Sequence, residues 1–86
     1  MVKVKKEKVE KKVIKIFAKY TDKKNKNIQK ESKLKEELGL TSYDLLSITA
    51  DFEKAFSITF QDITCLENLY TVEDVTNFIY QRLLTE

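Results

Sequence analysis

Glycine and proline are nearly absent from this chain of 86 residues, which contains one glycine, Gly39, and no proline. These two residues supply most sharp turns and interrupt helices, so their scarcity favours helices joined by few tight turns. It also excludes a Gly-rich phosphate-binding loop. A chain of this length holds one modest core and no deep catalytic cavity. We therefore predict a single all-α domain over residues 1–86, with its function on the surface.

Reactive and metal-ligating side chains are equally scarce. The chain has no histidine and one cysteine, Cys65, which excludes Cys/His zinc sites, Cys–His dyads, Ser-His-Asp triads and an internal disulfide. Adjacent carboxylates such as Glu36 and Glu37 have no second group to position them for acid–base chemistry. The sequence therefore predicts a protein that is not an enzyme and has no metal site.

Hydropathy indicates a protein outside the membrane. No apolar stretch is long enough for a transmembrane helix, and the lysine-rich start lacks the apolar segment of a signal peptide. We expect a cytoplasmic protein without stable membrane insertion.

Charge divides the chain into two parts, although the formal net charge is only +2. Residues 1–35 carry fourteen lysines against four acids, whereas residues 36–86 carry two basic residues against ten acids. Such an asymmetry means either that the two parts attract each other or that each faces a different partner.

Apolar residues recur at helical spacing along most of the chain. We predict principal helices over 5–20, 42–56 and 71–83, a short helix over 62–68, and a long connection over 21–40. This connection is anchored by Ile28 and contains a helical turn that ends at Gly39. The core is expected to contain Phe17, Leu45, Ile48, Phe52, Phe56, Phe60, Val75 and Ile79.

Capping residues mark the starts of the last two principal helices. Either Thr41 or Ser42 can act as the N-cap of the helix over 42–56, and Asp44 lies in its first turn. Thr71, with Asp74 three residues later, approximates a capping box at the start of the final helix.

Three short segments of the sequence together match the pattern of a known protein family. They read Leu38-Gly39-Leu40-Thr41-Ser42-Tyr43-Asp44, Asp51-Phe52-Glu53-Lys54-Ala55-Phe56 and Thr71-Val72-Glu73-Asp74-Val75. Over about residues 28–80 the chain resembles acyl carrier proteins and related phosphopantetheine-dependent carrier domains. The resemblance implies a small bundle of three main helices and one short helix that carries an acyl or aminoacyl group as a thioester.

The resemblance also implies a modification site. In this family a transferase moves 4′-phosphopantetheine from coenzyme A onto the serine of the motif, which is Ser42 here. A phosphodiester at a helix N-terminus meets free backbone N–H groups and the positive end of the dipole. The alternative is that Ser42 only caps the helix. Thr41 and Tyr43 replace the Asp and the Leu or Ile that usually flank this serine in the family.

Partner recognition in this family uses the outward faces of the same helix. The residues implied are Tyr43, Asp44, Leu46, Ser47, Ala50, Asp51 and Glu53. Their acids would meet basic patches on a phosphopantetheinyl transferase and on acyl-loading and acyl-processing enzymes. We expect a monomeric, freestanding carrier without nucleic acid. Its cargo stays open among fatty acyl, polyketide, peptide and D-alanyl groups.

A second hypothesis comes from the lysine-rich N-terminal segment. Its apolar residues share one helical face, so a basic amphipathic helix could bind an anionic membrane, an acidic protein or nucleic acid without any prosthetic group. The competing interpretation is that this apolar face closes the helical bundle.

Overall fold

The basic N-terminal segment forms a helix whose apolar residues all share one face. The computed structural model describes residues 5–21, 27–60 and 69–85, and in it α1 spans Lys6–Phe17. The face that packs inward consists of Val9, Val13, Ile16 and Phe17, which are all buried. The lysines of α1 are exposed around the rest of the helix. Burial of the apolar face therefore determines that the positive charge of α1 points to solvent.

The predicted end of this helix at Tyr20 is wrong, because α1 ends at Phe17. The N–H of the C-cap Ala18 still donates to the carbonyl of Ile14 at 2.9 Å. The two N–H groups after it bond to the third residue back: Lys19 donates to the carbonyl of Ile16 at 3.1 Å, and Tyr20 to that of Phe17 at 3.0 Å. Such bonds are typical of helix termini. Tyr20 is half-buried against the core beyond this turn.

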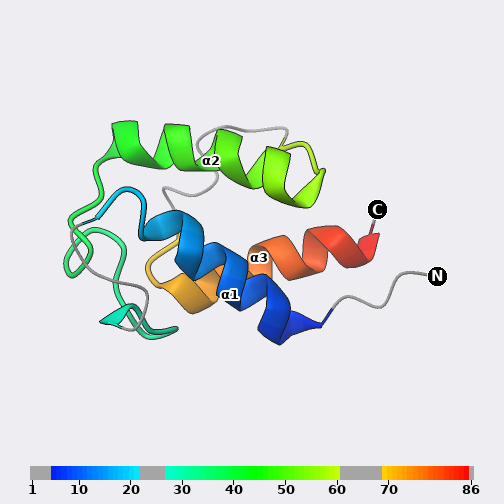
Figure 1. The fold of residues 1–86 in the computed structure, drawn as a ribbon, viewed down its shortest axis with the longest axis horizontal. Coiled ribbons are helices and arrows are strands. Elements are labelled where there is room, and N and C mark those ends of the chain that lie inside the picture. Colours follow the sequence, from blue (N-terminus) through cyan, green and yellow to red (C-terminus); the bar gives the residue numbers. More distant parts are fainter. Residues whose placement is uncertain (1–4, 22–26, 61–68, 86) are drawn as a thin grey trace.

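Two further helices complete the described architecture (Figure 1). Helix α2 spans Ser42–Phe56 and α3 spans Val72–Thr85, against predicted ranges of 42–56 and 71–83. Helix α1 packs against both of them, and Figure 1 shows it running opposite to α2 and α3. The all-α prediction is confirmed for the described residues, where the extended pairing is an isolated bridge between Lys33 and Thr71. The predicted short helix over 62–68 lies outside the described residues.

Aromatic rings fill the centre of the bundle. The rings of Phe17 and Phe52 join α1 to α2 edge to face, with centroids 5.6 Å apart and planes at 88°. Phe60 is buried after α2, as predicted, and its ring stacks on Phe78 of α3 at 5.6 Å. The other predicted core residues are buried too, except Phe56, which is half-buried. Edge-to-face and offset stacked rings are favourable arrangements for such pairs.

The described part of the long connection is held against the start of α3. Ile28 is buried, as the sequence predicts for an anchor. The N–H of Leu34 donates to the carbonyl of Tyr70 at 2.8 Å, and the N–H of Val72 donates to the carbonyl of Ser32 at 3.0 Å. These two bonds satisfy backbone groups on both segments and fix the path of the chain toward α2.

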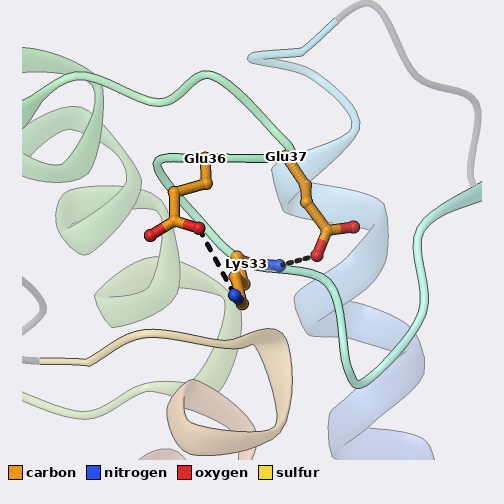
Figure 2. Close-up of polar contacts among 3 residues, drawn as sticks. All are labelled: Lys33, Glu36 and Glu37. Atoms are coloured by element: carbon orange, nitrogen blue, oxygen red, sulfur yellow. Dashed lines mark hydrogen bonds and ion pairs between the residues drawn. The ribbon is translucent and has the colours of Figure 1, made fainter.

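Lys33 makes two polar contacts in this connection (Figure 2). Its Nζ lies 3.3 Å from a carboxylate oxygen of Glu36, and its backbone N–H donates to Oε1 of Glu37 at 3.3 Å. Both partners of the ion pair are largely exposed, so the pair contributes little to stability. The buried leucines around it, Leu34 and Leu38, stabilise the turn more.

The turn before α2 depends on the backbone of Gly39. This residue has a φ of +68°, in the left-handed region that side chains disfavour, whereas Leu38 and Leu40 on either side are buried. A Cβ added at Gly39 would have no atom within 4 Å. The glycine is therefore required by its backbone conformation and not by a shortage of space.

A hydrogen bond links α2 to the turn after α1. The hydroxyl of Tyr20 donates to Oδ2 of Asp51 at 2.5 Å. This hydrogen bond, with partial burial and the negative charges of Asp51 and Asp44, raises the pKa of Tyr20 to about 12.

Within the described residues, no helix is both long and apolar enough to cross a membrane.

Replacing the glycine tests the role of its backbone conformation. We expect Gly39→Ala to lower the free energy of unfolding by about 1–2 kcal/mol, because alanine is strained at positive φ. Gly39→Asn should lower it by less, since asparagine tolerates this conformation. Urea unfolding followed by circular dichroism measures both values. Equal losses in the two variants would contradict this explanation.

Removing the tyrosine hydroxyl tests the link between α1 and α2. We expect Tyr20→Phe to lower the free energy of unfolding by about 1 kcal/mol at neutral pH. Since the pKa of Tyr20 in the folded protein lies above the ordinary tyrosine value of 10.0, this stabilisation is complete below pH 10 and is lost as the pH rises toward 12. Urea unfolding of both proteins from pH 7 to 12 measures the difference.

The exposed Tyr43 provides the control for this experiment, and Tyr43→Phe should leave stability unchanged. A difference between wild type and Tyr20→Phe that stays constant up to pH 12 would show that the hydrogen bond does not shift the tyrosine pKa.

Candidate functional site

The start of α2 is held by a capping box between Thr41 and Asp44. The N–H of Asp44 donates to Oγ1 of Thr41 at 3.1 Å, and the N–H of Thr41 donates to Oδ2 of Asp44 at 3.0 Å. The sequence allowed either Thr41 or Ser42 as the N-cap, and the structure assigns this role to Thr41. The same arrangement, Thr71 with Asp74, starts α3 as predicted.

Ser42 is consequently the first residue within α2 and is exposed. Its hydroxyl makes no hydrogen bond with any residue that the structure describes. The capping box does not use the N–H groups of Ser42 and Tyr43. These two groups stay without an acceptor in α2, because the first N–H groups of a helix have none within it. The hydroxyl therefore projects from the leading tip of α2, beside free amide donors and at the positive end of the helix dipole. An anion attached there would be stabilised.

Apolar residues continue from Ser42 along the outer side of α2. Tyr43 is 78% exposed and Leu46 is 39% exposed, and Ala50 is exposed as well. Ser47 lies between them and is half-buried. The inward stripe of the same helix is buried in the core, so these side chains form a separate surface next to the serine.

The three acids predicted to bind partners each make a hydrogen bond within the protein. Asp44 completes the capping box, Asp51 accepts from Tyr20, and Oε2 of Glu53 accepts from the N–H of Phe60 at 2.9 Å. The spacing of the acids along α2 gave no signal of the last two contacts, because Tyr20 and Phe60 belong to other segments. Among the described residues, no acids or cysteine gather into a group of three that could hold a metal ion.

Several lysines of the N-terminal segment lie next to α2, a position that the sequence did not predict. Lys12, Lys15 and Lys19 line a hollow with Asp51 and Lys54. Their spacing of three and four residues is a sequence signal for one helical face, but it does not reveal which helix lies beside them. The apolar face of α1 is in the core, so it is not free to enter a membrane, as one form of the second hypothesis requires.

Comparison with known proteins agrees with this geometry. The family model described as "Phosphopantetheine attachment site" matches residues 11–79. An acyl carrier protein of Phytoplasma australiense is 37% identical over 59 residues, which cover 69% of this chain and 76% of that protein. An acyl carrier protein of Thermotoga maritima is 36% identical over 56 residues, which cover 65% of this chain and 68% of that protein.

A solved structure shows the same fold. It is the solution structure of the apo doublet acyl carrier protein from prodigiosin biosynthesis, with a TM-score of 0.73 and 23% sequence identity. The match covers 95% of this chain and 40% of that chain. The family match includes α2 and most of α1 and α3. The chain therefore belongs to the acyl carrier protein family, whose members carry the phosphopantetheine attachment site.

Proposed function

We propose that Ser42 is the attachment point for 4′-phosphopantetheine and that the chain carries an acyl group on this arm as a thioester. The main support is the division of roles at the tip of α2. Thr41 and Asp44 satisfy the cap, so the exposed Ser42 hydroxyl is available for modification. Capping by Thr41 also supports the proposal over the alternative in which Ser42 only caps the helix.

The chemistry of attachment requires little from the carrier. The Ser42 oxygen forms the new bond to phosphorus, the phosphoanhydride bond of coenzyme A breaks, and the nucleotide part of coenzyme A leaves. The hydroxyl proton passes to a base of the transferase, because this chain contains no histidine to accept it. The finished phosphodiester lies beside the free N–H groups of Ser42 and Tyr43. The chain is thus a carrier and not a catalyst.

The surface around Ser42 suits repeated and brief contacts with enzymes. Tyr43, Leu46 and Ala50 offer apolar area that a partner covers as the arm enters its active site. Asp44, Ser47, Asp51 and Glu53 flank this area, and their free oxygens can accept further hydrogen bonds. The proposed partners are a phosphopantetheinyl transferase and the enzymes that load and process the acyl group. A monomeric state and a cytoplasmic location stay predictions from the sequence.

Intact mass tests the attachment site directly. After incubation with coenzyme A and a broad-specificity transferase, the wild type should gain the mass of one phosphopantetheine group. Ser42→Ala should gain none, and Ser47→Ala, on the same helix, should be modified like the wild type. Circular dichroism checks that both variants keep their helices. Modification of Ser42→Ala, or no mass gain in the wild type with several transferases, would contradict the proposal.

The residue before the serine provides a second prediction. Aspartate is also a good N-cap, so Thr41→Asp should keep α2 while it restores the acid usual in the family. We expect it to raise the initial rate of mass gain several-fold with a broad-specificity transferase. Thr41→Asn, which caps without charge, should react like the wild type. Equal rates for Thr41→Asp and Thr41→Asn would show that the transferase does not read this charge.

A further inference from the structure

Five lysines in and next to α1 stand along one edge of the helix. Their spacing is three, four, three and four residues: Lys5, Lys8, Lys12, Lys15 and Lys19. Residues at these intervals are neighbours on a helix surface, and all five are exposed. The acids of α1, Glu7 and Glu10, fall on the opposite side of the helical wheel. The edge therefore carries positive charge only.

Packing brings this edge beside the C-terminal half of α2. Two adjoining hollows, which share Lys12 and Ala55, run between the two helices. Lys54 of α2 lines one of them. We name this feature the basic groove and define it by its lysines, which are Lys5, Lys8, Lys12, Lys15, Lys19 and Lys54.

The charge of the basic groove is not balanced within the described part of the protein. None of its six lysines forms an ion pair with a residue that the structure describes, although Lys12 Nζ lies 5.6 Å from the centroid of the Phe56 ring. Asp51 is the acid that lines the groove, and its Oδ2 already accepts from Tyr20. Like charges at this spacing destabilise a helix. An acidic partner in the groove would relieve that repulsion.

The lining of the groove distinguishes among anionic partners. A bilayer would gain only charge contacts, because the apolar face of α1 is already buried in the core. The residues that line the groove include no arginine and no exposed aromatic ring on which bases stack. A ridge of carboxylates on a protein matches both the concave shape and the row of exposed ammonium groups.

The groove is also within reach of an enzyme that binds at Ser42. A helix rises about 1.5 Å per residue, so Asp51 and Lys54 lie roughly 14–18 Å from Ser42 along α2. An ordinary protein interface covers roughly 800 Å² on each partner, which corresponds to a patch about 30 Å across. One docked enzyme can therefore cover the serine and the groove together.

We infer that the basic groove docks an acidic surface of the enzymes that act on the arm at Ser42. This inference rests on the proposed carrier function and names the chemistry of its partners. The enzyme would then make two contacts of opposite charge with the carrier. The acids of α2 would meet its basic groups, and the lysines of the basic groove would meet its acidic groups. Such a pair of contacts fixes the orientation of the enzyme on the carrier, because rotating either partner would bring like charges together.

Two pairs of lysine substitutions on α1 test the groove. The probe is a fluorescein-labelled helical peptide rich in glutamate, and anisotropy measures its binding at low and high salt. Lys12→Gln with Lys15→Gln should weaken binding about fivefold or more. Lys6→Gln with Lys11→Gln removes the same charge outside the groove and should weaken binding less than about twofold. Salt should weaken binding to the wild type, since it screens exposed charges.

The same variants link the groove to the enzyme. With the phosphopantetheinyl transferase encoded in the same genome, Lys12→Gln with Lys15→Gln should raise KM for the carrier about threefold or more and leave kcat unchanged. Lys6→Gln with Lys11→Gln should leave both constants unchanged. Unchanged KM in the groove variant would overturn the inference, as would equal effects of the two pairs. Tighter binding to phosphatidylserine vesicles or to a DNA duplex than to the peptide would also overturn it.

Failure of the groove and failure of the carrier function give different results. Ser42→Ala should bind the peptide like the wild type, because Ser42 is not part of the groove, and should gain no mass. Peptide binding without any modification of the wild type would contradict the carrier function, and with it the identity of the proposed partner, while the groove would remain a binding site for acidic surfaces. If both double variants are modified like the wild type, the inference about the groove is wrong and the carrier function stands.

Discussion

Burial of the apolar face of α1 is the interaction on which the rest of the structure depends. The edge-to-face contact of Phe17 with Phe52 joins α1 to α2, and the same face of α1 packs against α3. A chain of this size has only one core, so α1 cannot leave without exposing the apolar faces of the other two helices. This packing turns the lysines outward and brings Tyr20 to Asp51. The charge division along the sequence thus becomes a division between surfaces of one bundle.

The tip of α2 shows how local chemistry can free a residue for function. Gly39 adopts positive φ between two buried leucines, and α2 begins three residues later at Ser42. Thr41 and Asp44 then satisfy each other's backbone N–H groups. Ser42 follows the cap and contributes nothing to it, so its replacement or modification leaves the helix start intact. On the proposed carrier function, Thr41 and Asp44 stabilise the helix start while the neighbouring Ser42 carries the arm, so a bulky group could be attached without loss of the fold.

The acids of α2 bond to other parts of the protein and can still accept further hydrogen bonds. Asp51 and Glu53 each hold another segment against α2 through one oxygen, and carboxylates retain further acceptor capacity. A partner that approaches these acids therefore meets groups whose orientation is already fixed. Lysines from α1 stand next to Asp51, so the two sides of α2 differ in charge. The surface around Asp51 therefore carries charges of both signs.

The sequence by itself determined the helical class, the range of α2, the capping box of α3, the buried anchor Ile28 and the serine at the start of α2. These features depend on side chains within a few residues of one another, where spacing and capping rules apply. The predicted end of α1 was wrong, because hydrophobic periodicity does not distinguish a continued helix from a tightened last turn. Only the tertiary structure decided that Thr41 is the cap, that Tyr20 and Phe60 engage the acids of α2, and that lysines of α1 line a groove with Lys54. The Tyr20–Asp51 bond and the groove join residues far apart in the chain, and they follow from how the three apolar faces pack, which residue order alone does not specify. The cap and the Glu53–Phe60 bond are local, but each depends on the path of the backbone at one end of α2.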